Sequence, residues 1–177
     1  MLQTEWDGEF ATIHPSLVLG PPLDKSVKSS LELILALANH DYPGNPPIQF
    51  DWVDVRDVAE AHVVATEHPA AKGRYITSTN QPGPISRFSL AMNKTHPDVG
   101  CPTNNLPWFV LWSASWCDGR LTKHFLYELC TPQAGYSSAK LQSELGYALP
   151  HTDLEVTLGD TLTAMKKLGM LKKKYDS

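Results

Sequence analysis

Residues 10–22 read FATIHPSLVLGPP, and this stretch decides how the chain folds. Residues 10–19 form a nearly continuous apolar run, which is typical of a strand buried on both faces of a parallel sheet. The Gly-Pro-Pro sequence at 20–22 closes its carboxyl end as a turn. Pro15 lacks the N–H group that a ladder hydrogen bond needs. The strand is therefore predicted to lie at a sheet edge or to break at Pro15.

Downstream of this strand, helical and extended patterns alternate. The spacing of Asp57 and Glu60 fits a capping box, which predicts a helix that begins there and stops before Pro69. The expected segments are a helix over 26–39, a strand over 48–55, the helix from the capping box to about residue 67, a strand over 74–78, a helical or irregular segment over 107–116, and helices over 86–95, 120–129, 138–145 and 154–168. Strands that alternate with helices, followed by a mainly helical part, predict an α/β fold.

Composition and charge exclude several classes of protein. The 177 residues carry a net charge of −4, which gives no general attraction to nucleic acid or to anionic lipid. The most apolar stretches, 31–38 and 106–116, are far shorter than the roughly 20 residues of a membrane helix. The three cysteines are odd in number and widely spaced, which argues against a disulfide framework. We therefore expect a cytoplasmic protein with neither a nucleic-acid nor a membrane partner.

Three aspartates, Asp51, Asp54 and Asp57, are spaced three apart and invite a metal-site interpretation. Calcium-binding loops use alternate positions and a glycine turn, and neither is present here. The seven histidines show no ligand pairing either. We therefore expect no metal. Asp57 should cap a helix, while Asp54 and Arg56 should fix the preceding turn through local polar contacts.

Three blocks of sequence resemble the extended short-chain dehydrogenase/reductases of the NAD-dependent epimerase/dehydratase superfamily. The blocks are IHPSLVLGP at 13–21, FDWVDVRDVAEAH at 50–62 with GRYI at 73–76, and YSSAKLQSELGY at 136–147, which leads into 154–168. They are most similar to the branch of dihydroflavonol reductases, cinnamoyl-CoA reductases and bacterial aldehyde reductases. Each motif alone is moderately specific, so their order and spacing carry the resemblance.

The resemblance implies the carboxyl-terminal part of a doubly wound, Rossmann-like fold without its amino-terminal βαβ units. Residues 1–177 would then be a single incomplete domain. Residual Rossmann-type strands and helices would occupy 10–80, and a mainly helical substrate-binding segment with a tail would occupy 81–177.

The resemblance also implies an NADP or NAD cofactor whose nicotinamide ring lies against Pro15. Backbone groups near Ser16 and Leu17 would hold its carboxamide. A strand that ends at Pro15 suits this contact, because ligands of open α/β sheets bind at the carboxyl ends of the strands. From the residues alone, an edge-strand proline without a ligand is the simpler interpretation.

Two features that the chemistry of this family needs are absent from their expected places. The chain has no G-x-x-G-x-x-G turn to hold the cofactor's pyrophosphate at a helix start. A Tyr-x-x-x-Lys pair, in which the lysine lowers the tyrosine pKa for proton transfer, should precede the strand at 10–19. Tyr136 and Lys140 have this spacing, and would share a helix face, but they follow the strand. We interpret them as a coincidence in which Ser137 or Ser138 caps a short helix and Lys140 is solvated, so no catalytic residue is expected.

A stripe of tryptophans follows the predicted sheet. Trp108, Trp112 and Trp116 repeat every four residues and share one face if the segment is helical. The resemblance implies a substrate site walled by this region, with contacts at Gly20, Pro21, Trp108 and Trp112. Core packing, or an exposed patch left by an absent neighbour, is the alternative.

The sequence thus predicts the carboxyl-terminal portion of an NAD(P)-dependent oxidoreductase that acts on a carbonyl or secondary alcohol and is inactive alone. Its partners would be a small-molecule carbonyl substrate and either a separately supplied amino-terminal half or a second copy of the chain. An alternative is a non-catalytic interaction module that pairs with a partner chain through the exposed edge of the strand at 10–19. A degenerate product without function is a third interpretation.

Overall fold

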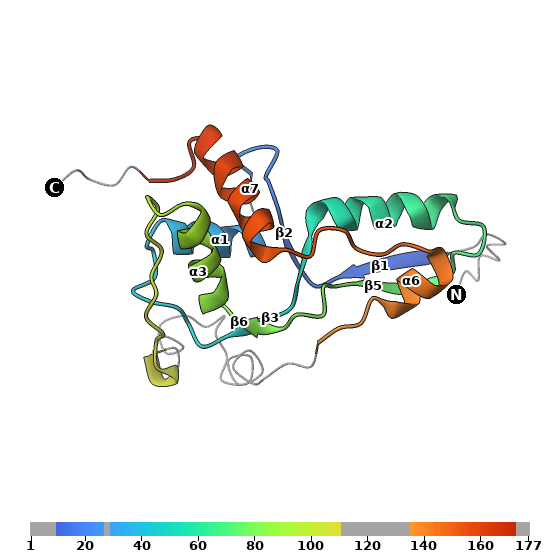
Figure 1. Cartoon of the computed structure of the whole chain (residues 1–177), viewed down its shortest axis with the longest axis horizontal. Helices are drawn as coiled ribbons and strands as arrows, with labels where there is room; N and C mark the ends of the chain where they lie inside the picture. The colour runs from blue at the N-terminus through green and yellow to red at the C-terminus, as the bar shows by residue number, and fades with distance from the viewer. Residues whose placement is uncertain (1–9, 27–28, 111–134, 173–177) are drawn as a thin grey trace, which may run out of the picture.

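The computed structural model describes residues 10–26, 29–110 and 135–172. Its elements are β1 Ala11–Pro15, β2 Leu17–Leu19, α1 Ser30–Ala38, β3 Gln49–Phe50, β4 Trp52–Asp54, α2 Val55–Glu67, β5 Gly73–Thr77, β6 Gly83–Pro84, α3 Ser86–Thr95, α6 Ala139–Leu145 and α7 Leu154–Lys167. They form an elongated molecule with two packed bodies (Figure 1). One body contains β1 and β5 with α2 and α6, and the other contains α1, α3 and α7.

The apolar run at 10–19 forms two strands rather than one. β1 pairs in parallel with β5, whereas β2 pairs in parallel with β4. Between them the Ser16 N–H donates to the Thr77 carbonyl (3.0 Å) and the Leu17 N–H donates to the Asp51 carbonyl (3.1 Å), so the chain changes pairs over a single residue. The break predicted at Pro15 is confirmed. Pro15 removes no hydrogen bond to β5, because alternate residues of a strand face opposite edges and those on either side of Pro15 face β5.

Helix α2 begins earlier than its predicted capping box. Asp54 is the residue that caps it, since the Asp54 carboxylate accepts a hydrogen bond from the Arg56 N–H (2.9 Å). The prediction that Asp57 caps this helix is wrong. β4 continues to Asp54, so the helix starts directly behind the strand, and the fully buried Asp57 side chain lies in its first turn. The predicted end before Pro69 is confirmed.

The helices that follow the sheet agree closely with the sequence. α3, α6 and α7 lie within one residue of their predicted ranges, and α6 ends at Gly146 with a φ of 69°. This left-handed conformation favours glycine and explains the stop. α1 begins later than predicted, at a capping box of Ser29 and Glu32. The predicted strand at 48–55 is divided, because β3 pairs antiparallel with β6 while β4 pairs with β2.

The segment at 107–116, predicted as helical or irregular, is described as far as residue 110. Residues 108–110 are helical. The remainder of 107–116 and the predicted helix at 120–129 lie outside the described residues. Among the described helices, none combines the length and the apolar character that crossing a membrane requires.

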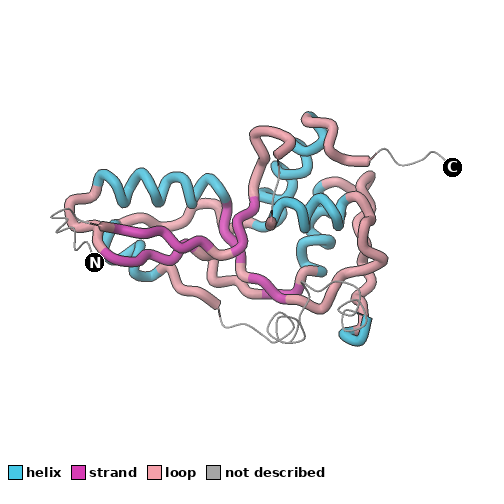
Figure 2. The backbone as a smooth tube through the Cα atoms, turned by 180° about the vertical axis from the view of Figure 1, so that it is seen from behind, coloured by secondary structure: helices cyan, strands magenta, loops and turns pink. Residues whose placement is uncertain are grey.

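Two separate hydrophobic clusters form the core. The larger one joins α1, α3 and α7 around side chains such as Trp52, Phe88 and Leu158. The smaller one lies between the β1–β5 pair, α2 and α6, and its buried members include Tyr75 and Leu141. Seen from behind, β1 and β5 run side by side with α2 along them (Figure 2). Parallel strand pairs covered by helices give the chain the predicted α/β class.

Candidate functional site

A hollow of about 420 Å³ lies at the carboxyl end of β1, where the chain passes from one strand pair to the other. Its lining residues come from β1, the β1–β2 junction, β5, the β3–β4 junction and the segment before α6; they are His14, Pro15, Ser16, Leu17, Phe50, Asp51, Ile76 and Tyr136. The three residues predicted to contact a nicotinamide therefore line one hollow together. Carboxyl ends of parallel strands are where open α/β sheets bind ligands.

Ser16 provides a polar group in this hollow that the fold itself does not use. The Ser16 and Leu17 N–H groups are both occupied by backbone carbonyls. The Ser16 hydroxyl oxygen, in contrast, is buried and has no hydrogen-bond partner among the described residues. A buried hydroxyl without a partner costs free energy unless a ligand or water satisfies it. The hydroxyl is therefore the group through which Ser16 can bind a ligand.

Asp51 holds the rim of the hollow together. Its side chain is almost completely buried. One carboxylate oxygen accepts hydrogen bonds from the N–H groups of Trp52 (2.9 Å) and Gln81 (3.0 Å), and the other accepts one from the N–H of Tyr136 (3.1 Å). The segments at Gln81 and Tyr136, both distant in sequence from Asp51, are thus bound to its carboxylate. No spacing in the sequence indicates this role, because the partners lie up to 85 residues from Asp51.

These residues fit the nicotinamide end of a dinucleotide. Pro15, Leu17 and Ile76 offer an apolar wall for a planar ring, and the unpartnered Ser16 hydroxyl suits a carboxamide. The fit differs in one respect from the sequence-based expectation, which placed the carboxamide on backbone groups near Ser16 and Leu17. Their N–H donors already serve the sheet, and the Ser16 hydroxyl is the group of these two residues that has no hydrogen-bond partner among the described residues.

Gly20, Pro21 and Trp108, the described residues among those predicted to contact substrate, do not line this hollow. Gly20 is buried with a φ of 137°, and a side chain there would lie 2.5 Å from a Val55 methyl carbon, so its role in the structure is close packing against α2. Pro21 follows it at partial exposure, and Trp108 is 66% exposed on the other body. Trp112 and Trp116 lie outside the described residues.

Tyr136 and Lys140 do not form a catalytic pair. Tyr136 precedes α6 instead of lying on it, so the two side chains do not share a helix face. Lys140 is not simply solvated as predicted: its ammonium group donates to the Arg74 carbonyl (3.3 Å) and lies 4.5 Å from the centre of the Tyr75 ring. Ser138 occupies the cap position of α6 as one of the two predicted serines, but its hydroxyl makes no capping hydrogen bond, and the Ser137 hydroxyl accepts from the Ala139 N–H (3.2 Å).

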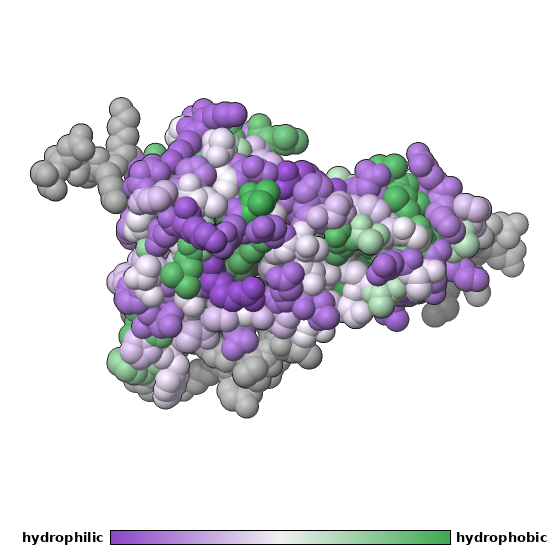
Figure 3. Space-filling model, in the orientation of Figure 1, coloured by the Kyte–Doolittle hydropathy of each residue, from purple (hydrophilic) through white to green (hydrophobic). Residues whose placement is uncertain are grey.

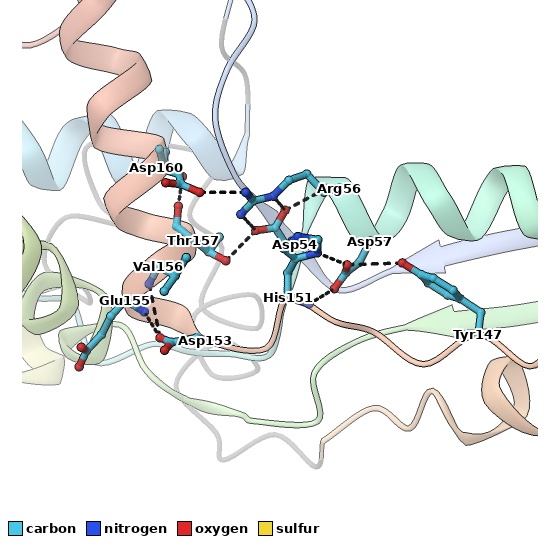
Figure 4. Close-up of polar contacts among 11 residues, drawn as sticks. Asp54, Arg56, Asp57, Tyr147, His151, Asp153, Glu155, Val156, Thr157 and Asp160 are labelled. Carbon is cyan, nitrogen blue, oxygen red and sulfur yellow. Dashed lines mark hydrogen bonds and ion pairs between the residues drawn. The ribbon is translucent and has the colours of Figure 1, made fainter.

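Asp54 and Asp57 place two buried carboxylates at the start of α2. These carboxylates bind α7 and the segment before it (Figure 4). Asp54 accepts hydrogen bonds from the Arg56 guanidinium (2.7 Å) and the Thr157 hydroxyl (2.6 Å), and Arg56 also reaches Asp160 (2.8 Å). Burial alone would raise the pKa of Asp54. The hydrogen bonds from Arg56 and Thr157 outweigh burial and hold this pKa below its ordinary value.

Asp57 forms the second buried centre. The His151 Nδ1 lies 2.5 Å from one Asp57 carboxylate oxygen, and the His151 N–H donates to the other (3.1 Å). The Tyr147 hydroxyl donates to the same carboxylate at 3.4 Å. The pKa of Tyr147 is raised above its ordinary value. Burial is the largest cause, and the negative charge of Asp57 is the second largest. Each aspartate of the 51–54–57 series thus has its own protein partners, and no group of three or more potential metal ligands occurs among the described residues.

Comparison with known proteins agrees with the resemblance inferred from the motifs. The chain is 40% identical over 97 residues to cinnamoyl-CoA reductase 1 of Arabidopsis thaliana, and 34% identical over 97 residues to a bifunctional dihydroflavonol 4-reductase/flavanone 4-reductase of Malus domestica. Each match covers 54% of this chain and 27% of the relative. No family model matches the chain.

The solved structures extend the likeness to the fold. A nucleoside-diphosphate-sugar epimerase from Pseudomonas aeruginosa superimposes with a TM-score of 0.70 at 18% identity, over 92% of this chain and 49% of the epimerase. The chain therefore has the fold of about half of such a protein. The predicted resemblance to the cinnamoyl-CoA and dihydroflavonol reductases and the predicted Rossmann-like α/β class are both confirmed.

Proposed function

We propose that this chain supplies the nicotinamide side of the active site in an NAD(P)-dependent oxidoreductase that acts on a small-molecule carbonyl or secondary alcohol. The observation that carries the proposal is the hollow at the end of β1, which Pro15, Leu17 and the unpartnered Ser16 hydroxyl share. The likeness to two reductases supports the reaction class.

In this role the residues of the chain bind and orient. The apolar side chains of Pro15, Leu17 and Ile76 form a wall for the ring, and the Ser16 hydroxyl exchanges a hydrogen bond with the carboxamide. A nicotinamide cofactor, when bound, supplies or accepts a hydride. Asp51 acts on the same hollow as a positioning residue, because it fastens the segments on its rim.

We also propose that the chain does not turn over by itself. Proton transfer to a carbonyl needs a positioned acid, and Tyr136 and Lys140 do not form the required pair. The sequence also contains no glycine-rich turn for the pyrophosphate. The purified chain with NADPH and an aldehyde or dihydroflavonol should leave the absorbance of NADPH unchanged. Clear turnover that Tyr136→Phe abolishes would overturn this proposal.

Binding of nicotinamide mononucleotide tests the hollow without turnover. Its addition should shift the backbone NMR signals of Ser16, Leu17 and Ile76. Ser16→Ala should raise the dissociation constant by roughly threefold to tenfold, because it removes one hydrogen bond to the ligand. The fold should be unaffected, because the hydroxyl has no hydrogen-bond partner in the part of the chain that the structure describes. Ser143→Ala, outside the hollow on α6, is the matched control and should bind normally. Equal binding by Ser16→Ala would reject the site.

The substrate side of this proposal rests on fewer observations. Contacts at Gly20, Pro21, Trp108 and Trp112 stay predictions, and the exposed ring of Trp108 is the feature that supports an apolar wall. Either NAD or NADP would suit the residues that line the hollow.

A non-catalytic interaction module is the second candidate function. The observation that favours it is the position of β1, which pairs with β5 on one side and with no described strand on the other. Exposed strand edges seek partners. Size-exclusion chromatography tests this function. If the chain elutes as a stable monomer at all concentrations, and also in the presence of each candidate partner, the result would count against it.

A further inference from the structure

A second hollow, of about 650 Å³, lies between α3 and the start of α7, and the name α3–α7 hollow is used for it below. Its wall on α3 consists of four residues that share one face of the helix, namely Arg87, Leu90, Ala91 and Lys94. Gln81 and residues 152–155 complete the lining, and none of these residues lines the hollow at the end of β1. Figure 3 shows hydrophobic side chains among hydrophilic ones over α3 and the start of α7.

The guanidinium of Arg87 is held in place by the backbone before α3. Its Nη1 group donates to the carbonyls of Gln81 (3.3 Å) and Pro82 (3.5 Å). Gly83 makes this position available, because a Cβ atom there would lie 2.5 Å from the Nη1 and 2.7 Å from the Cδ of Arg87. The Nε and Nη2 groups of Arg87 have no hydrogen-bond partner among the described residues. The fold thus orients this guanidinium and leaves one of its edges for a ligand.

The other charged groups of the hollow already have partners in the protein. The Lys94 ammonium contacts the Glu155 carboxylate at 2.7 Å. The Asp153 carboxylate accepts the Glu155 N–H (2.9 Å) at the start of α7, where the positive end of the helix dipole favours a negative charge. No described residue forms an ion pair with Arg87. Arg87 therefore carries the charge that the described part of the chain leaves unpaired in this hollow.

The neighbours of Arg87 define the chemistry of a ligand. The Nε–H and Nη2–H donors of a guanidinium lie side by side and match the two oxygens of a carboxylate. Leu90, which is 58% exposed, and Ala91 lie on the same face of α3 three and four residues after Arg87. An apolar group attached to the carboxylate would lose water-exposed surface against them. We propose that the α3–α7 hollow binds a small organic acid with one carboxylate and an apolar tail.

The wall on α7 restricts the charge of this acid. It contributes the carboxylates of Asp153 and Glu155, so the formal charges of the residues that line the hollow cancel. A single negative charge on the ligand is met by Arg87. A second one would lie near the two carboxylates, and like charges repel. The hollow therefore selects a monocarboxylate over a phosphate monoester with the same tail.

Four small probes test this selectivity on the full chain by NMR. Hexanoate should shift the backbone signals of Leu90 and Ala91 and the Nε–H signal of Arg87 until the site is saturated. Acetate lacks the tail and hexan-1-ol lacks the charge, so each should bind at least roughly tenfold more weakly. Hexyl phosphate should also bind more weakly than hexanoate. The absence of a saturable shift at these residues, or equal or tighter binding of any of the other three probes, would overturn the proposal.

Two variants test the role of Arg87. Arg87→Gln should raise the dissociation constant of hexanoate by roughly tenfold or more, because it removes a charged hydrogen-bonding partner. Gly83→Ala leaves every charge in place but displaces the guanidinium, so it should also weaken binding. The fold should tolerate this change, because the atoms displaced belong to the end of a flexible side chain and Gly83 has no positive φ. Arg74→Gln, an exposed arginine of β5 outside the hollow, is the matched control and should bind normally.

The double variant decides whether Gly83 acts through Arg87. In the Arg87→Gln background, Gly83→Ala should have no further effect on hexanoate binding, since the two changes remove the same interaction. Additive effects of the two substitutions would contradict the assigned arrangement. Native affinity of Arg87→Gln, or an equal loss in Arg74→Gln, would reject Arg87 as the carboxylate-binding residue.

Discussion

Asp54 serves two elements with one carboxylate. It caps α2 through the Arg56 N–H and accepts the Thr157 hydroxyl of α7 at 2.6 Å. Its side chain is fully buried, whereas Arg56 is 36% exposed. The contact is therefore neither a surface ion pair, which contributes little, nor a fully buried pair with a large desolvation cost. The relative position of α2 and α7 depends on this residue.

Asp54→Asn should lower the free energy of unfolding by about 1.5–3 kcal/mol at neutral pH, the range for a hydrogen bond to a charged group. Because the folded-state pKa of Asp54 is lowered, its contribution is fully present above the unfolded-state pKa of about 3.9 and is lost as pH falls through the folded value. Urea unfolding of both proteins from pH 7 to pH 3 should show the difference shrinking below about pH 4.

Asp160→Asn is the matched control, because Asp160 bonds the same guanidinium but is 47% exposed. Its cost should stay below about 1 kcal/mol at neutral pH. A larger loss for Asp160→Asn than for Asp54→Asn, or a difference for Asp54→Asn that does not change with pH, would show that charge on Asp54 is not the stabilising feature.

Among the elements, the strand break was predictable and the start of α2 was not. Pro15 interrupts an apolar run, and a proline inside such a run by itself predicts a break. Asp54 and Asp57 are both plausible caps by residue type. The choice between them depends on β4 pairing with β2 as far as Asp54, a tertiary contact that spacing along the chain does not reveal.

The residues of the candidate site also divide into those that the sequence predicts and those that only the tertiary structure reveals. Pro15, Ser16 and Leu17 are adjacent in sequence, so a motif could identify them, and the structure places them in one hollow. Asp51 and Tyr136 complete that hollow through a hydrogen bond that spans 85 residues. His151 reaches Asp57 over 94 residues. Such contacts are set by the packing of the two bodies, and no local pattern encodes them.

The Ser138 side chain joins the start of helix α6 to Ser78, the residue directly after β5. The Ser138 hydroxyl accepts from the Ser78 N–H (2.8 Å) and donates to the Ser78 carbonyl (2.7 Å). Ser138→Ala leaves both backbone groups without these partners and should cost about 1–3 kcal/mol in unfolding free energy. The exposed neighbour Ser137 accepts one hydrogen bond from the Ala139 N–H (3.2 Å), so Ser137→Ala should cost less, about 0.5–1 kcal/mol. Urea denaturation of both variants tests the order, and a reversed order would contradict the assignment.

At the scale of the whole molecule, polar contacts join two bodies that have separate hydrophobic clusters. The smaller cluster, which includes Tyr75 and Leu141, depends on a two-stranded sheet. A two-stranded sheet is marginal in water unless it packs against other elements. The larger cluster unites three helices around Trp52 and Phe88. The two bodies therefore differ in the amount of buried apolar surface that stabilises them.

This difference in buried apolar surface predicts that the backbone amides of the two bodies exchange with two different free energies of opening. Regions with smaller apolar cores open at lower free energy than the whole protein. Under native conditions the amides of β5 and α6 should exchange with a free energy of opening about 1–3 kcal/mol below that of α3 and α7. Protein NMR with increasing sub-denaturing urea measures both values. Equal values for both bodies in the free chain would mean that the polar contacts at Asp54 and Asp57 couple them into one cooperative unit.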